Sequence, residues 1–307
     1  MANNNGVKQS KNIVKIIGIL VENSLKQGTY KNAEQKDVEY ISGALNIRVN
    51  QMISGREEVN EIPINVWVAK YTKNGALNPA YESMRKAMET YVSLAVCDDE
   101  SKATKVLITT GNLTENIFSA DGQNVFCSPR IQASFINSIT NIANYVPEAT
   151  FTTDMVVGNV TDEVDKEGVA TGRLKVKGMV CRYNGTMDTF DYVVEHPDAI
   201  NYIRSYWKIG DTVQVSGKIR FTVKTEQIEV PTRFGDPVFK TKTTNCRELV
   251  ITADSSDVLT EADKYSEEEV KNGLAKRAEL IEKAKENAKK SSSGTTTPAT
   301  KSNPYGF

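Results

Sequence analysis

Apolar and polar residues alternate along most of residues 13–254, which is the pattern of strands that bury one face. One helix-period segment interrupts the first half of this region at residues 78–94, where Asn78 is a candidate N-cap and Pro79 stands in the first turn. The predicted order is therefore three strands, a helix and two strands. The five predicted strands cover residues 13–23, 37–50, 61–71, 104–118 and 123–135.

The same order of elements recurs in the second half of the chain. Strand patterns cover residues 150–164, 169–185 and 186–195, a short helical segment follows, and two further strands begin at residues 210 and 246. Similar short segments occupy matching positions in the two halves, such as SGALNIRV from Ser42 and TGRLKVKG from Thr171. The spacing between the repeats varies, so the pattern indicates a duplicated domain and not a solenoid.

The remaining segments predict appendages to these two domains. Ser266 and Glu269 form a capping box before a helix with a thin apolar stripe, and the composition after Lys290 is that of a flexible linker. With a division near Asn144–Glu148, the predicted segments are a disordered arm (1–12), a first domain (13–146), a second domain (147–256), a C-terminal helix (257–290) and a disordered tail (291–307).

Composition gives little support for catalysis. The 307-residue chain carries a formal net charge of −1, one histidine and four cysteines without a CxxC pair. It contains no phosphate-binding glycine loop, and one histidine is too few for the usual metal sites or acid–base pairs. We therefore predict a non-enzymatic protein without a catalytic residue, metal or cofactor. No apolar run is long enough to span a membrane, and the start of the chain lacks the apolar core of a signal peptide, so we expect a cytoplasmic protein, or one of the host cytoplasm if a phage encodes it.

The strand predicted at residues 210–221 has two unlike faces. Val215, Ile219 and Phe221 share one face, whereas Lys218 and Arg220 share the other. The apolar face is expected to close the core of the second domain, and the polar face to form a basic outer surface.

A second basic strand face is predicted in GRLKVKG. Arg173, Lys175 and Lys177 alternate with apolar residues, and residues 168–187 contain no acid while Arg182 adds a fourth cation. Phosphates that approach this face would release counterions, the main source of sequence-independent affinity. The alternative is a solvated strand face whose lysines guard an edge.

A long connection joins the last two strands of the second domain. It interleaves cations with aromatic rings, as expected of a loop that holds single-stranded nucleic acid by its backbone and its bases. The alternative is a β-hairpin that packs its own phenylalanines. The residues concerned are Lys224, Arg233, Phe234, Phe239, Lys240 and Lys242.

The first domain offers aromatic residues on its predicted outer face. Tyr40, Arg48, Trp67 and Tyr71 alternate with aliphatic residues of the second and third strands, so they lie outside if the aliphatic faces fill the core. Exposed rings on a sheet suggest a binding surface. The alternative is that Trp67 packs under the helix or against the second domain.

Five strands with a helix between the third and fourth is the order of the OB-fold, a Greek-key barrel. In this order and in its strand patterning, the region from Ile13 to Asp254 resembles the tandem OB-fold single-stranded DNA-binding proteins of phages and cells. The resemblance implies a mainly β fold with two five-stranded barrels, and a ligand that crosses strands 2 and 3 between the loops that border them. Bacterial members of that group often end in an acidic, aromatic tip. This chain ends in Phe307, but residues 291–307 contain no acid.

The combined prediction is a protein that binds single-stranded DNA with little sequence preference and protects it during replication or recombination, in the manner of a phage protein. Replication or recombination proteins are candidate partners of the C-terminal helix or tail, and no membrane is expected as a partner. Two alternatives stay open at this point. One is an RNA- or tRNA-binding OB module, and the other is a structural or scaffold protein that assembles through its exposed aromatic residues and C-terminal helix.

Overall fold

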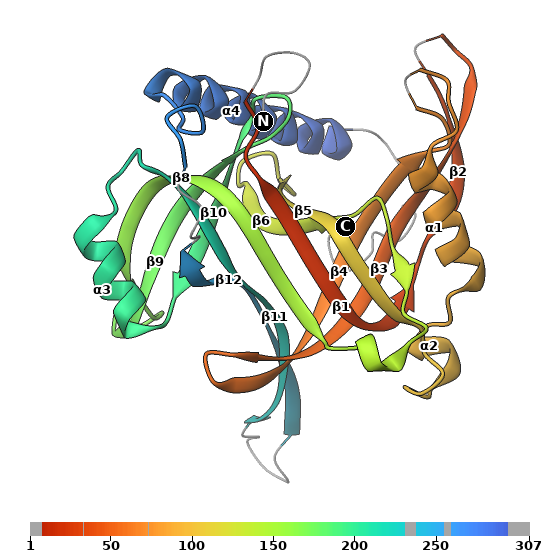
Figure 1. The fold of residues 1–307 in the computed structure, drawn as a ribbon, viewed down its shortest axis with the longest axis horizontal. Helices are drawn as coiled ribbons and strands as arrows, with labels where there is room; N and C mark the ends of the chain where they lie inside the picture. Colours follow the sequence, from red (N-terminus) through yellow and green to blue (C-terminus); the bar gives the residue numbers. More distant parts are fainter. Residues whose placement is uncertain (1–7, 33, 73, 231–237, 255–258, 294–307) are drawn as a thin grey trace.

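The computed structural model describes residues 8–32, 34–72, 74–230, 238–254 and 259–293. It is mainly β with a long C-terminal helix, and the strands are connected in one sheet. Two curved halves lie side by side, and the C-terminal helix runs along one of them and reaches the other at its end (Figure 1).

The first half has the predicted order of strands and helix. A helix follows the third main strand because Asn78 accepts a hydrogen bond from the Ala80 backbone N–H and Pro79 fixes the first turn. The main elements are β1 (Asn12–Asn23), β3 (Asp37–Ile53), β4 (Arg56–Ala69), α1 (Pro79–Thr90), β5 (Lys105–Phe118) and β6 (Phe126–Gln132).

These five strands pair in a ring. The order is β1, β3, β4, β6 and β5, and β5 pairs back with β1. All of the pairings are antiparallel except that of β4 with β6, which is parallel. The parallel pair exists because α1 and β5 intervene between β4 and β6 in the chain.

The second half repeats this arrangement. Its strands pair in the order β8, β9, β10, β12 and β11, with β11 returning to β8 and the β10–β12 pair parallel. His196 is the N-cap of the intervening helix, and its side chain accepts from the Asp198 N–H. The elements are β8 (Glu148–Val164), β9 (Ala170–Cys181), β10 (Met187–Val194), α3 (Pro197–Tyr206), β11 (Thr212–Val230) and β12 (Val238–Asp254).

The two halves meet along β1 and β8, which run antiparallel from the Asn12–Thr153 pair to the Ile17–Glu148 pair (Figure 1). Two buried amide side chains of the first half also bond the backbone of the second. Gln51 donates to the Ile219 carbonyl and accepts from the Ala149 N–H, both at 2.9 Å. Asn60 accepts from the Phe221 N–H at 2.8 Å.

Apolar side chains inside the two rings form one continuous core. The predicted inward positions Val215, Ile219 and Phe221 are buried, as are Leu174 and Val176 on β9. Gly217 is required at its place in β11, because a Cβ there would lie 2.1 Å from the Val250 carbonyl oxygen and against the Phe151 ring.

The C-terminal helix α4 (Glu267–Ser293) begins at the predicted capping box, in which Ser266 and Glu269 bond reciprocally. Its Arg277 reaches Glu115 of β5, while Val270 and Leu274 pack beside Met187 of the second half. The segment around Ser10 also docks here, since Ser10 is buried and its hydroxyl lies 3.1 Å from that of Tyr265. Residues 1–7 and 294–307, on which most of the predicted arm and tail fall, lie outside the described residues.

Several short elements were not predicted. A strand, β2 (Lys26–Lys31), pairs with the start of β3, and the β11–β12 hairpin is longer than the predicted strands. The others are α2 (Leu94–Cys97), β7 (Asn137–Ser138) and the 3-10 turn η1 (Ile142–Asn144).

Candidate nucleic-acid interface

Three aromatic side chains lie together on the outer face of the first half. The ring centroids of Tyr40 and Trp67 are 5.9 Å apart with planes inclined by 26°, and Tyr30 lies 5.8 Å from Trp67 and 5.9 Å from Tyr40. Trp67 is 58% exposed and Tyr30 is 37% exposed. We call Tyr30, Tyr40 and Trp67 the aromatic cluster.

Strand alternation places the aromatic cluster outside. Ile41 of β3 and Val68 of β4, the neighbours of Tyr40 and Trp67, are buried in the core, so the rings must point to the opposite face. On β2, Gly28 pairs with Tyr40, and a Cβ at Gly28 would lie 2.7 Å from Cζ of that ring. The absence of a side chain at residue 28 therefore makes room for Tyr40.

Glu39, which precedes Tyr40 in β3, forms an ion pair with Lys70. Lys70 Nζ lies 2.6 Å from Glu39 Oε1 and 5.9 Å from the ring centroid of Tyr71, which is exposed. The hydrogen bond from Lys70 lowers the pKa of the Glu39 carboxyl, so the pair stays charged at neutral pH. Arg48 lies on the same outer face of β3 but pairs with Glu61 at 3.2 Å and with Glu100 at 3.1 Å.

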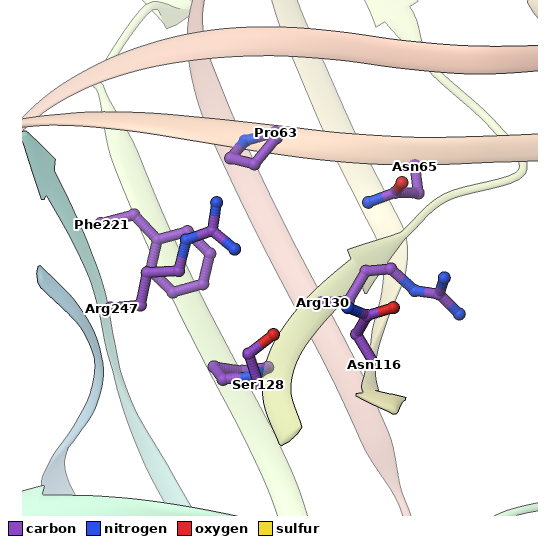
Figure 2. Close-up of a pocket in the computed structure, with 8 residues that line it drawn as sticks. Pro63, Asn65, Asn116, Ser128, Arg130, Phe221 and Arg247 are labelled. Carbon is purple, nitrogen blue, oxygen red and sulfur yellow. The ribbon is translucent and has the colours of Figure 1, made fainter. Parts of the chain in front are cut away.

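A pocket opens where β4 and β6 of the first half approach β11 and β12 of the second (Figure 2). Figure 2 shows Arg247 over the ring of Phe221 on one side of it, and Arg130 near Asn65 and Asn116 on the other. We call this hollow the seam pocket. Its lining is Pro63, Asn65, Asn116, Ser128, Pro129, Arg130, Phe221 and Arg247.

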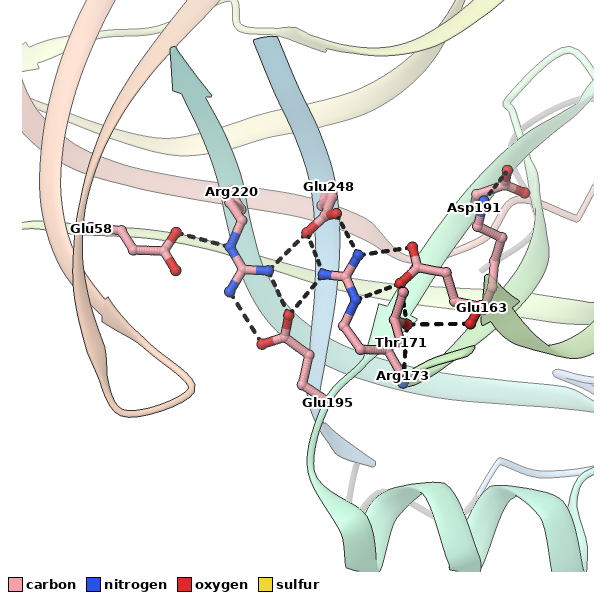
Figure 3. A network of polar contacts seen from close by, with 9 residues as sticks. Glu58, Glu163, Thr171, Arg173, Asp191, Glu195, Arg220 and Glu248 are labelled. Carbon is pink, nitrogen blue, oxygen red and sulfur yellow. Dashed lines mark hydrogen bonds and ion pairs between the residues drawn. The ribbon is translucent and has the colours of Figure 1, made fainter. Parts of the chain in front are cut away.

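The predicted basic outer face of β11 differs in the structure, because Arg220 is not open to solvent. Its side chain is only 10% exposed and bonds Glu58 of the first half at 2.8 Å and Glu195 and Glu248 at 2.7 Å (Figure 3). The β3–β4 hairpin brings Glu58 over β11, and the polar face of that strand is covered where Arg220 stands.

Arg173 of β9 belongs to the same network and is likewise not part of an open basic face. It contacts Glu163 at 2.5 Å and Glu195 and Glu248 at 3.0 Å (Figure 3). The hydrogen bond from Arg220 lowers the pKa of Glu195 to about 2. Four glutamates against two arginines give this network a formal charge of −2, which does not attract phosphate.

Arg182 is also bonded within the protein, to one carboxylate and one backbone carbonyl. Its Nε lies 2.5 Å from Oδ2 of the buried Asp188, and its Nη2 donates to the Glu115 carbonyl at 3.2 Å. Because these groups already bond its guanidinium, the structure gives no support to the prediction that Arg182 binds DNA.

Three lysines on the second half are less engaged in ion pairs than these arginines. Lys177 is exposed and Lys218 is half-buried, and within the described part of the chain neither forms an ion pair. Lys175 lies 3.9 Å from Asp191, at the limit of an ion pair.

The predicted aromatic and basic connection is the end of the β11–β12 hairpin. Phe239 is 60% exposed. Arg233 and Phe234 lie outside the described residues, and the side chains of Lys224, Lys240 and Lys242 lie outside the described part of their strands.

The model of one protein family matches residues 11–287, which is nearly the whole described structure. The description of that family is YorF. This chain belongs to the YorF family.

Among solved structures, the YorF-family chain is similar to a deletion mutant of the single-stranded DNA-binding protein from Thermus aquaticus. The two share 12% sequence identity with a TM-score of 0.46, over 82% of this chain and 97% of that one. A comparison with curated proteins gives no match. In the described part of this YorF-family chain, no helix is long and apolar enough to cross a membrane, and no group of three or more His, Cys, Asp or Glu residues is placed to hold a metal ion.

Sequence reasoning placed Tyr40 and Trp67 of the YorF-family chain on one outer face but missed Tyr30, Arg130 and Arg247. The alternation in KQGTYK could have indicated β2 and with it Tyr30. Nothing in the sequence near Arg130 or Arg247 indicates that they line one pocket, because they are joined only by the contact between the two halves.

Proposed function

We propose that this protein binds single-stranded DNA with little sequence preference, and that bases stack on the aromatic cluster of Tyr30, Tyr40 and Trp67. The observation that carries the proposal is that these three rings lie together on the outer face of adjacent strands, with Tyr30 and Trp67 exposed and Tyr40 half-buried. Each base stacked on an aromatic side chain contributes roughly 1–3 kcal/mol, and every base has a face that can stack. A role in replication or recombination, and a phage setting, stay predictions within this proposal.

The strand pairing supports the view that each half is an OB-fold barrel and a domain of its own. In both halves five strands form a ring that a parallel pair completes, and a helix stands between the third and fourth main strands. In such a barrel the ligand face is formed by the second and third strands, which in the first half are β3 and β4. The aromatic cluster lies on these strands and on β2, which extends them.

Cations on the second half would hold the phosphates. Within the predicted set, we retain Tyr40, Trp67, Tyr71, Lys175, Lys177 and Lys218 as binding residues, with the hairpin residues of β11 and β12 as further candidates. Arg173, Arg182 and Arg220 are assigned to the folded structure instead, because carboxylates and a carbonyl already occupy their guanidinium groups. Arg48 is held in the same way by Glu61 and Glu100.

The two tryptophans of the chain allow a direct test. Trp67 is exposed on the aromatic cluster, whereas Trp207 packs partly buried against the core. A Trp207→Phe variant leaves Trp67 as the one fluorophore of this type. We expect oligo-dT to quench its emission as DNA binds, because a base would stack on the indole.

The matching affinity experiment uses Trp67→Ala. We expect this variant to bind fluorescent oligo-dT roughly 5- to 150-fold more weakly, the equivalent of about 1–3 kcal/mol of stacking. The dependence of affinity on salt should change little, since stacking releases few counterions. Trp207→Phe serves as the matched control and should bind like the wild type.

Parallel titrations with oligo-U and duplex DNA separate the alternatives. Preference for oligo-U would assign the rings to RNA. Absence of binding to either single strand, in a folded protein, would contradict the proposal and leave the aromatic cluster as a surface for assembly.

A further inference from the structure

Two arginines line the seam pocket without a carboxylate partner among the described residues. Arg130 of β6 has only a 3.4 Å contact from its Nε to the Thr114 hydroxyl, and Arg247 of β12 has the ring of Phe221, 5.6 Å from its Cζ. No acidic residue lines this pocket. In this respect Arg130 and Arg247 differ from Arg48, Arg173, Arg182, Arg220 and Arg277, each of which is paired with at least one carboxylate.

The carboxylates of neighbouring positions are already engaged. Glu61 of β4 pairs with Arg48, and Glu115, which precedes Asn116 in β5, pairs with Arg277 at 2.5 Å. Asp188 pairs with Arg182. Glu115 and Asp188, which are buried, cannot turn to the seam pocket without leaving another arginine without this carboxylate partner, which is costly in a buried site.

Partial burial makes the positive charges of Arg130 and Arg247 unfavourable in the protein without a bound ligand. Loss of hydration lowers the pKa of both Arg130 and Arg247, and the positive charge of Arg182 lowers that of Arg130 further, an effect that the charge of Asp188 offsets in part. An anion in the pocket would offset both effects. The amides of Asn65 and Asn116 and the hydroxyl of Ser128 supply additional neutral hydrogen-bond donors around it (Figure 2).

The pocket is continuous with the aromatic cluster along one strand. Trp67, Asn65 and Pro63 are alternate residues of β4 and share its outer face, whereas Ile64 and Val66 between them are buried. A strand of DNA stacked on Trp67 can therefore follow β4 to the seam, where Arg247 belongs to the other half of the molecule.

We infer that the seam pocket binds the phosphate backbone of single-stranded DNA through Arg130 and Arg247, so that the DNA crosses from the first half of the molecule to the second. This inference rests on the proposed function. A planar guanidinium with several N–H donors suits a phosphate, and the two groups lie on different sides of the pocket, where each can contact the backbone of one DNA strand (Figure 2).

The test measures the affinity of the full chain for fluorescent oligo-dT at a series of salt concentrations. We expect Arg130→Ala and Arg247→Ala each to weaken binding roughly three- to tenfold and to reduce the slope of log affinity against log salt by about 0.7. Arg85→Ala is the matched control, because Arg85 is an exposed arginine of α1 that pairs with Glu82 and Glu89. It should leave both quantities unchanged.

Arg130→Gln and Arg247→Gln keep hydrogen-bond donors while they remove the charge. They therefore test whether a loss of binding in the alanine variants comes from the lost charge and not from misfolding. Because neither arginine has a carboxylate partner, we expect these variants to melt no earlier than the wild type. They should show the same loss of salt slope as the alanine variants.

The outcomes separate this inference from the proposed function. If folded Arg130 and Arg247 variants keep the wild-type affinity and slope while Trp67→Ala weakens binding, the seam pocket does not hold the DNA. If the wild type fails to bind oligo-dT at all, the proposed function fails first.

A competition experiment distinguishes a phosphate of DNA from a free phosphate compound as the ligand of the seam pocket. We expect inorganic pyrophosphate to displace oligo-dT only at millimolar concentration, as a weak competitor for one contact. Displacement at micromolar concentration, lost in Arg130→Ala, would show a site for a free phosphate compound and would overturn the assignment to DNA.

Discussion

Arg220 and Lys177 both stand on the polar face of a strand, yet only Lys177 presents its charge to solvent. Arg220 is surrounded by Glu58, Glu195 and Glu248, and its hydrogen bonds leave no donor edge open to a phosphate. The surroundings of a cation thus decide whether it stabilises the fold or binds a ligand.

We expect Arg220→Ala to lower the free energy of unfolding by roughly 3–5 kcal/mol, because it leaves partly buried carboxylates without their main partner. Urea denaturation at neutral pH measures the change. The exposed Arg85→Ala serves as control, and its loss should stay under about 1 kcal/mol. An Arg220→Ala variant as stable as this control would show that the network contributes little.

The pKa of Glu195 predicts how the network responds to acid. Its folded-state pKa of about 2 lies below the ordinary value of 4.5, so its contribution is fully present above about pH 4.5 and is lost as the pH falls toward 2. The contribution is on the order of 3 kcal/mol, since one pKa unit equals about 1.4 kcal/mol. We expect the stability difference between wild type and Glu195→Gln to shrink across this window. A difference that stays constant from pH 7 to pH 3 would contradict the assigned cause.

At the scale of single elements, alternation along a strand is enough to separate inside from outside. It placed Ile41 and Val68 in the core and Tyr40 and Trp67 on the surface, and the capping residues Asn78 and Ser266 marked where helices begin. Alternation does not predict which other segments of the chain pack over the outer face of a strand. Glu58 lies 2.8 Å from Arg220 across 162 residues of sequence, and no local pattern encodes that contact.

The helix α4 illustrates how one element can depend on one buried pair. Arg277 reaches both carboxylate oxygens of Glu115, whose side chain is 1% exposed. We expect Arg277→Met to destabilise the protein by roughly 3–5 kcal/mol, because it leaves a buried carboxylate with too few partners. The double variant Glu115→Gln/Arg277→Met should recover part of this loss, as thermal melting would show.

Lys285→Met is the matched control on the same helix. Lys285 pairs with Glu282 one turn away, and such a pair contributes about 0.5 kcal/mol or less. Equal losses in the single and double variants would mean that packing of α4, and not the ion pair, decides its docking.

At the scale of the whole molecule, the sequence predicted two similar halves but not the way in which they join. The division near Asn144–Glu148 stays a prediction. The contacts that connect the halves use Gln51 and Asn60, polar residues in otherwise ordinary strand patterns. Their role depends on backbone groups that reach them only in the folded chain.

We expect the two halves to unfold together, because hydrogen bonds between β1 and β8 and the buried amides of Gln51 and Asn60 cross between them. Calorimetry should show a single transition with matching calorimetric and van't Hoff enthalpies. Gln51→Leu should lower that transition as a unit, since two buried backbone groups lose their partner at roughly 1–3 kcal/mol each. Two separate transitions in the wild type would contradict this coupling.

The pairing of β1 has a consequence for synthesis on the ribosome. On the edge of β1 that pairs with β3 at residues 19–23, residues 12–17 find their partner in β8, which leaves the ribosome long after β3 and β5 have formed. A nascent chain that ends before residue 148 therefore exposes an edge of unpaired N–H and C=O groups, which invites pairing with a neighbouring chain on the same messenger RNA. Translation past residue 153 closes this edge, so a pause in that interval would favour exchange of β1 or β8 between two copies of the protein.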